Sequence, residues 1–220
     1  MNSNLELLLE EHQSNKVIKR LIDILVPGGG TINDVLSSYL LKEKERRLKV
    51  FYEALANEEI KLTDEVIASD EFLNKYFITL KAVTETRRNE KIVYFAKLLN
   101  NSNSDSISHA SNQYDDFVKV LDDLTYQELF VLKQISEHEI KHHIQNARKI
   151  MIGRRFYKIL KTKVAMELGI SEDEALSIFT RLERTGCVNH TKATPLMQDS
   201  NDAIVTTDFY LKLESLALQP

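Results

Sequence analysis

Apolar residues recur mostly at steps of three and four residues over long stretches of this chain, which is the spacing of one face of an α-helix. A first such stripe runs from Leu5 to Leu25. Glycine and proline, which most often interrupt helices, number only six and three among 220 residues. The sequence therefore predicts a mainly α fold, beginning with an N-terminal helical hairpin or bundle.

Three long helical runs are predicted in the N-terminal part. The first ends at Pro27–Gly30, the second extends to about Ile60, and the third covers Asp64 to about Leu99. Whether Ser69 interrupts the third run is left open by the pattern. Aromatic residues are frequent on the apolar stripes, which fits either a self-contained core or a bundle that binds a partner or a second copy.

A polar stretch at residues 100–113 contains one large apolar residue and is too poor in hydrophobic side chains to pack. We therefore expect a helical assembly or partner-binding domain at residues 1–99, a linker at 100–113 and a second domain at 114–220. The second domain is predicted to have a helix that opens at Thr125, because Thr125 and Glu128 have the spacing of a capping box.

Charge is unevenly distributed. Up to Val118, 15 Lys and Arg residues face 19 Asp and Glu residues, whereas the remainder holds 14 of each. The segment from Ile140 to Met166 contains eight basic residues and no acidic one. Such a segment is typical of a face that binds phosphates, and it is also compatible with an ordinary solvated helix surface.

Several classes of protein are disfavoured by the sequence. The single cysteine, Cys187, excludes an intrachain disulfide and fits a reducing cytoplasm. Apolar runs are too short to span a bilayer, and the N-terminus lacks the layout of a signal peptide. Pro27–Gly30 lacks the Lys-Ser/Thr ending of a P-loop. We expect a cytoplasmic protein with no membrane contact, no cofactor and no evident small-molecule substrate.

A succession of short elements is predicted near the C-terminus. Along the chain they are a helix at 161–169, a helix at 172–185, a β-branched stretch at 187–194, a turn-rich tip at 195–202, a second stretch at 203–207 and a helix at 209–218. Gly169 and Gly186 are placed to end the first two helices. Ser171 and Asp208 are placed to cap the helices that follow them.

Part of this region resembles the winged-helix domains of bacterial transcription regulators, over about residues 119–218. The resemblance rests on Leu168-Gly-Ile-Ser171 followed by Ala175, and on Leu182-Glu-Arg-Thr-Gly-Cys-Val188. It implies a C-terminal winged helix-turn-helix with a small two-stranded ribbon, docking on nucleic acid or protein. The expected core consists of Val164, Ala165, Leu168, Ile170, Ala175, Leu176, Ile178, Phe179 and Leu182.

The resemblance also implies which side chains would meet nucleic acid. The second helix would present Ser177, Thr180, Arg181 and Arg184, and the wing Lys192. The basic run adds further candidate phosphate contacts at Lys149, Arg154, Arg155, Lys161 and Lys163. Against direct base recognition, the helix begins with Glu172-Asp173-Glu174, which repels phosphate, and it offers no Asn or Gln to adenine.

One short motif matches a metal-binding pattern. His138-Glu139-Ile140-Lys141-His142 has the H-E-x-x-H form in which two histidines one helical turn apart hold Zn²⁺ and the glutamate acts as a base. Charged neighbours crowd the motif, and no strong strand is predicted before Cys187 to bind a peptide substrate. We interpret the match as chance and expect no enzyme activity, with His138 and His142 as the only candidate metal ligands.

The sequence thus favours a non-enzymatic regulatory protein of bacterial type, which assembles as a homo-oligomer through its N-terminal helices. Its winged helix would dock on a protein partner or weakly on the DNA backbone. One alternative is a sequence-specific DNA-binding transcription regulator that uses Arg181, Arg184 and Lys192. Another is a zinc-dependent hydrolase that uses His138, Glu139 and His142.

Overall fold

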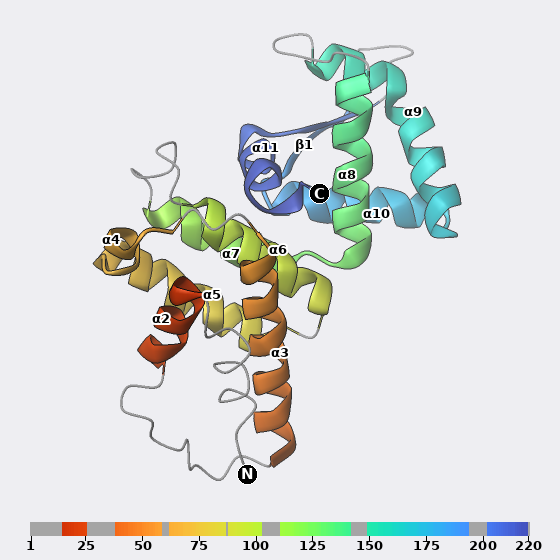
Figure 1. Cartoon of the computed structure of the whole chain (residues 1–220). Helices are drawn as coiled ribbons and strands as arrows, with labels where there is room; N and C mark the ends of the chain where they lie inside the picture. Colours follow the sequence, from red (N-terminus) through yellow and green to blue (C-terminus); the bar gives the residue numbers. More distant parts are fainter. Residues whose placement is uncertain are drawn as a thin grey trace. The chain divides into compact units, whose positions relative to one another are not determined.

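The computed structural model describes residues 15–25, 38–58, 62–86, 88–102, 111–141, 149–193 and 202–219 (Figure 1). These residues are mainly helical and include one two-stranded antiparallel sheet, which confirms the predicted mainly α fold class. None of the helices within these ranges combines the length and hydropathy needed to cross a bilayer. The predicted loop at Pro27–Gly30 and most of the predicted wing tip lie outside the described residues.

Contacts divide the chain into two compact units. Unit 1 comprises Met1–Asp122 and Ser215–Pro220, and unit 2 comprises Asp123–Glu214. The described helices of unit 1 are α2 (Lys16–Leu25), α3 (Ser38–Asn57), α4 (Asp64–Ile67), α5 (Asp70–Glu85), α6 (Asn89–Asn101) and α7 (Ser111–Asp123, whose last residue is assigned to unit 2).

Hydrogen-bonded tyrosines organise the interior of unit 1. The hydroxyl of Tyr76 donates to the Leu21 carbonyl at 2.7 Å and lies 2.6 Å from the Tyr52 hydroxyl, which joins α2, α3 and α5. The aromatic side chains of the predicted stripe are fully buried at Phe51, Tyr52, Phe72, Tyr76 and Phe95. Their burial within unit 1 supports a self-contained core, one of the two alternatives left open by the sequence.

The third predicted run is three separate helices. Ser69 interrupts it, since the Ser69 hydroxyl accepts from the Phe72 N–H at 3.2 Å and caps α5. The polar stretch after Glu85 then separates α5 from α6. Each helix thereby gains its own angle against the core, which one long helix could not provide.

Along the chain, the two units divide between Asp122 and Asp123, after the polar stretch at 100–113 that was expected to be a linker. Helix α7 packs in unit 1 through Tyr114, Phe117 and Leu121, and the Tyr114 hydroxyl lies 2.5 Å from that of Thr79. The chain's last residues also belong to unit 1, where the Leu216 carbonyl accepts from Asn101 at 2.9 Å. Both sets of contacts join residues that are remote in sequence.

Unit 2 combines helices with the small sheet. Its elements are α8 (Tyr126–Lys141), α9 (Lys149–Leu168), α10 (Glu172–Arg184), β1 (Val188–Thr191), β2 (Ala203–Thr206) and α11 (Asp208–Leu213), after which a π-helical turn η2 (Glu214–Leu218) leads back to unit 1 residues. The strands pair antiparallel, with Val188 opposite Thr206 and Thr191 opposite Ala203. Strand β2 packs against both α8 and α9 (Figure 1).

Helix α9 is longer than predicted. The helix expected to start at Lys161 is the second half of a single 20-residue helix that begins at Lys149. Tyr157 and Leu160 are buried and continue the apolar face formed by Val164, so the packing has no break at Lys161. Gly153, which would weaken an isolated helix, instead lets the helix backbone approach β2.

Helix ends in unit 2 mostly follow the predicted signals. Capping boxes form at Thr125–Glu128 and Ser171–Glu174, and both were anticipated from spacing or capping preference. Gly169 and Gly186 adopt φ of 65° and 74°, which glycine tolerates without strain. The predicted cap of the last helix was wrong by one residue, because Thr207 accepts from the Tyr210 N–H and Asp208 lies within the first turn.

The expected winged-helix core is partly buried. Val164, Ala165, Ala175, Ile178, Phe179 and Leu182 are buried, whereas Leu168, Ile170 and Leu176 keep intermediate exposure. The three partly exposed residues lie near the α9–α10 turn or on the rim of α10, where fewer elements cover them.

Candidate binding surfaces of the C-terminal unit

The glutamate of the H-E-x-x-H motif holds strand β2. The Thr206 N–H donates to Glu139 Oε1 at 2.7 Å, and the Thr206 hydroxyl donates to Glu139 Oε2 at 2.5 Å. Both residues are buried. A carboxylate that accepts these bonds is engaged in the core rather than directed at a bound water, so its position is that of a structural anchor.

The motif's histidines do not form a metal site within the described residues. His138 is half-buried and packs its ring edge-on against Phe156, with centroids 4.7 Å apart, and His142 lies outside the described residues. In the part of the chain that the structure describes, no group of His, Cys, Asp and Glu side chains could hold a metal ion.

A second polar cluster also joins distant segments. Glu214 accepts from the Ser136 hydroxyl at 2.8 Å and from the Tyr210 hydroxyl at 2.9 Å, which links α8 to the chain's last helical segment. No spacing rule in the sequence could have identified this cluster, because Ser136 and Glu214 are 78 residues apart. Both hydroxyls donate to the same carboxylate, so this cluster too is a structural anchor.

His190 is buried in β1, near the end of the ribbon that leads into the predicted wing tip. Its Nε2 lies 3.2 Å from the Tyr157 hydroxyl and 3.7 Å from Asp202 Oδ2, and its ring is near Phe179. Burial, with a further contribution from Asp202, raises the pKa of Tyr157 to about 12. Asp202 also accepts from the Ala193 N–H at 2.8 Å, which closes the ends of the two strands. The cluster holds the two strands together at the end of the ribbon that leads into the predicted wing tip.

The first turn of α10 is engaged by α9. Lys161 Nζ lies 2.8 Å from Glu172 Oε2, and the Thr162 hydroxyl donates to Glu172 Oε1 at 2.7 Å. The hydrogen bond from Lys161 is the main reason that the pKa of Glu172 is lowered. Lys161, a predicted phosphate contact, is therefore committed to a carboxylate within unit 2.

The polar residues in the middle of α10 bond to their own helix. The hydroxyl of Ser177 donates to the Asp173 carbonyl at 3.0 Å, and that of Thr180 donates to the Leu176 carbonyl at 3.1 Å. Both residues were predicted to face a nucleic acid. Their hydroxyls already have acceptors, which reduces what they would gain from a base edge.

Arg181 is held against α8. Its Nε lies 2.9 Å from Oε1 of Glu128, whose side chain is only 8% exposed while that of Arg181 is 43% exposed. Burial alone would raise the pKa of Glu128, but hydrogen bonds from Thr125 and Arg181 outweigh it and lower that pKa. Arg181, one of the predicted nucleic-acid contacts, thus joins α10 to the capping box of α8.

Replacing Glu128 by glutamine should make the free energy of unfolding less dependent on pH in the acidic range. Because the folded-state pKa of Glu128 is lowered, its ionised form contributes fully above the unfolded-state pKa, and the contribution is lost as pH falls through the folded-state pKa. We expect Glu128→Gln to cost about 1 kcal/mol at neutral pH, as for loss of a cap, with the difference shrinking in acid. Urea unfolding across pH measures this.

The matched control for this measurement is Glu137→Gln on the same helix. Glu137 is 53% exposed and lies 3.9 Å from Lys133, so its ion pair contributes little. A Glu128→Gln penalty of equal size at neutral and acidic pH would contradict the assigned role of the carboxylate.

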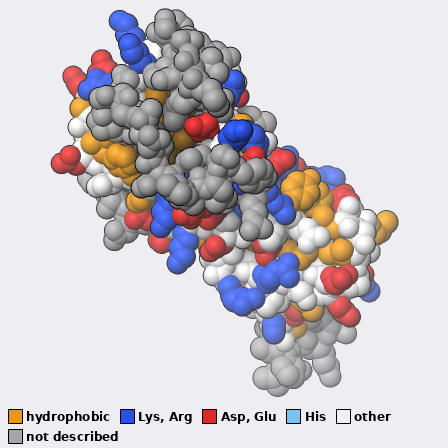
Figure 2. Space-filling view, turned by 90° about the horizontal axis from the view of Figure 1, so that it is seen from below, with side chains coloured by type: hydrophobic (Ala, Val, Ile, Leu, Met, Phe, Trp, Pro, Cys, Tyr) orange, Lys and Arg blue, Asp and Glu red, His pale blue; other side chains and the backbone are white. Residues whose placement is uncertain are grey.

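The other predicted nucleic-acid contacts are dispersed. Arg155, Arg184 and Lys192 are exposed, and Arg154 is half-buried with an interaction partner. Lys163 lies 3.8 Å from Glu167 on the same helix, and the side chain of Lys149 lies outside the described residues. In the space-filling view, hydrophobic, basic and acidic side chains of described residues share the visible face (Figure 2).

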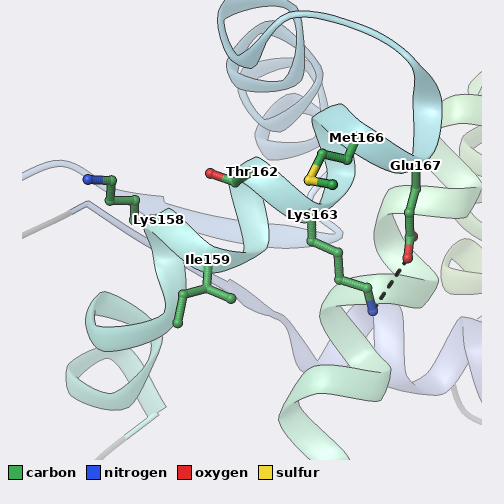
Figure 3. A pocket seen from close by; sticks show the side chains of 6 residues that line it. All are labelled: Lys158, Ile159, Thr162, Lys163, Met166 and Glu167. Atoms are coloured by element: carbon green, nitrogen blue, oxygen red, sulfur yellow. Dashed lines mark ion pairs between the residues drawn. The ribbon is translucent and has the colours of Figure 1, made fainter.

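Exposed apolar side chains on α9 are the feature that sequence analysis missed. Ile159 is 61% exposed and Met166 is 77% exposed, whereas Leu160 and Val164 on the opposite side are buried. The described residues that line a hollow of about 500 Å³ all belong to this helix (Figure 3): Lys158, Ile159, Thr162, Lys163, Met166 and Glu167. The seven-residue spacing of Ile159 and Met166 was the available signal.

Cys187 has the properties of a buried structural residue. Its side chain is inside unit 2, and burial raises the pKa of its thiol to about 11. The thiolate that would act as a nucleophile or metal ligand is therefore suppressed at neutral pH.

Comparison with protein-family models, with curated proteins and with solved structures finds no match to this chain.

Proposed function

We propose that this chain is a non-enzymatic regulatory protein whose C-terminal unit is a winged-helix module that binds a protein partner rather than reading DNA bases. The order α8, α9, α10, β1, β2 supports the winged-helix assignment, since helices followed by a two-stranded ribbon are the elements of that motif. In this assignment α9 and α10 form the helix-turn-helix, and β1 and β2 form the wing.

One observation carries the preference for protein over DNA bases: several polar side chains of α10, including Arg181, are engaged within unit 2. Arg181 bonds to Glu128, Glu172 bonds to Lys161, and Ser177 bonds to its own helix. A helix that reads bases needs side chains that can reach the groove edges. Releasing Arg181 from a nearly buried carboxylate would leave that charge without its partner, which is costly.

Binding of the full chain to a fluorescent random-sequence DNA duplex over a salt series tests this proposal. We expect no binding tighter than about 1 μM at physiological salt, and no loss of residual binding in the double variant Arg181→Ala, Arg184→Ala. The matched control is Lys133→Ala, which removes a cation elsewhere on unit 2. Tight binding that weakens steeply with salt and disappears in the double variant would sink the proposal in favour of a DNA-binding regulator.

A second candidate function is weak binding to the DNA backbone. It is favoured by the exposure of Arg155 and Lys158 on α9, which could contact phosphates without any base being read. In the same salt series this function would give binding that is lost in Arg155→Ala, Lys158→Ala and is indifferent to DNA sequence.

Assembly through unit 1 stays a prediction. The aromatic stripe that suggested it is used within the unit, and Phe77 on α5 is an exposed aromatic side chain that remains, at 48% exposure. A single exposed aromatic ring is common on monomeric proteins. Sedimentation of the full chain measures the oligomeric state directly.

A further inference from the structure

Helix α9 has an outer face that faces away from the core of unit 2. We define this face by Met151, Arg155, Ile159, Thr162 and Met166, which follow one another at steps of four, four, three and four residues. These steps keep side chains on one side of an α-helix. Met151 is 56% exposed, so hydrophobic side chains occur at both ends of the face.

Among the described side chains of α9, Ile159 and Met166 are the most exposed apolar ones. Ile159 and Met166 are seven residues apart with Thr162 between them, which is the spacing of one edge of a coiled-coil seam. Figure 3 shows these three side chains on α9, together with the lysines beside them. Contiguous exposed apolar side chains rimmed by polar ones mark binding surfaces.

Charges border the face on both sides. Since residues advance by about 100° along a helix, Lys158 lies on one side of the Ile159–Met166 line and Lys163 lies on the other. Arg155 adds a third cation within the face, and Glu167 is the one nearby anion on α9. The Lys163–Glu167 pair at 3.8 Å is exposed at both ends and contributes little, so a partner's carboxylate can replace it.

This charge pattern selects among occupants. If a second copy docked with its own α9, it would bring Arg155, Lys158 and Lys163 against the same cations, which is unfavourable. Nucleic acid would satisfy the cations but would leave Ile159 and Met166 without apolar contacts. A helix with an apolar stripe flanked by carboxylates satisfies both the hydrophobic and the charged side chains.

From these observations we propose that the outer face of α9 is a docking site for an acidic amphipathic helix of a partner protein. This inference rests on the proposed function, and it names the partner's chemistry. Ile159 and Met166 would pack between apolar side chains of the partner, and the flexible thioether of Met166 suits such a contact. Lys158 and Lys163 would each face a carboxylate and fix the orientation of the incoming helix.

A designed peptide tests the docking site. The probe is a fluorescein-labelled, side-chain-stapled helix of about three heptads, with leucine at positions a and d and glutamate at e and g. Binding to the full chain is followed by fluorescence anisotropy. We expect a Kd of about 10 μM, and at least about tenfold weaker binding for the same peptide with lysine in place of glutamate.

Variants locate the binding. Ile159→Ser, Met166→Ser should weaken binding of the acidic peptide at least about tenfold, because both apolar contacts are removed without a change of charge. Ile140→Ser is the matched control, since Ile140 is 70% exposed on α8 and lies outside the face. Circular dichroism checks that the variants fold, which their exposure leads us to expect.

The docking site would be overturned by equal binding of the acidic and basic peptides, by binding that Ile159→Ser, Met166→Ser leaves unchanged, or by self-association in sedimentation that this variant abolishes. The last would identify a second copy as the occupant. Failure of the peptide together with absence of DNA binding rejects the docking site and leaves the proposed function standing. Displacement of the peptide by duplex DNA would identify nucleic acid as the occupant and would reject the docking site in favour of binding to the DNA backbone.

Discussion

Replacing Gly153 by leucine will destabilise unit 2 by about 3 kcal/mol, at the upper end of what overpacking usually costs. Gly153 is buried in α9, where the helix lies closest to the sheet. A Cβ placed there would be 2.9 Å from Cγ1 of Val205 and 3.4 Å from the carbonyl oxygen of Ile204. A leucine side chain adds further atoms at the same place, and close-packed interiors have no room for them.

The sheet cannot easily move away to make room. Strand β2 is fixed from the other side by Glu139, which accepts both hydrogen bonds of Thr206, and it is paired along its length with β1. Val205, whose Cγ1 would be the atom nearest to the new Cβ, is buried and β-branched, so its side chain has few other rotamers. The collision therefore has to be relieved by separating α9 from β2.

Alanine at the same position separates two opposing effects. Gly153→Ala gains about 1 kcal/mol of helix propensity and adds one methyl group to the crowded contact. We expect it to be much less damaging than leucine. Arg155→Leu is the control, because it adds an apolar side chain to an exposed position of the same helix. Urea unfolding followed by circular dichroism compares them, and a Gly153→Leu protein as stable as the original would show that α9 does not press on β2.

Replacing Glu139 by alanine will cost unit 2 about 3 kcal/mol. The change removes two charge-assisted hydrogen bonds and leaves the buried Thr206 N–H without its acceptor. Hydrogen bonds to a charged group are stronger than neutral ones, and a buried donor without an acceptor adds a desolvation cost, so the loss of stability is large. Glu139→Gln retains one carbonyl acceptor and should cost roughly half as much. Thermal unfolding of the three proteins gives the comparison.

Glu137→Ala is the matched control, since Glu137 is exposed and only two residues away. It should change stability by less than about 0.5 kcal/mol. The same experiment separates the anchor from a zinc site. In an H-E-x-x-H hydrolase the glutamate is a base whose removal spares the fold, and the purified protein would carry stoichiometric zinc. A Glu139→Ala protein of unchanged stability that binds one zinc ion would reverse our assignment.

Local signals in the chain were sufficient for several elements of this fold. The capping box at Thr125 and the end of α10 at Gly186 each depend on residues within one or two turns. Capping hydrogen bonds and positive φ are settled by such neighbours, so a sequence displays them directly. The mainly α class follows in the same way from the spacing of apolar residues.

The candidate site was less accessible to the same reasoning. The basic residues between Ile140 and Met166 form one run in the sequence, but on a helix their side chains point in different directions. Lys161 forms an ion pair with Glu172 on α10, whereas Lys158 and Lys163 border the outer face of α9. The sequence also showed Arg181 on a helix face without showing that Glu128, 53 residues earlier, would hold it.

The sequence by itself determined most of the helical segments, where several of them begin and end, and the two β-branched stretches of the ribbon near the C-terminus. Only the tertiary structure decided that α7 packs with the first unit, that Glu139 accepts two hydrogen bonds from Thr206, and that the side chains of Ile159 and Met166 are exposed to solvent. The physical reason is that helix formation and capping are local, whereas burial and hydrogen-bond satisfaction depend on which remote segments meet.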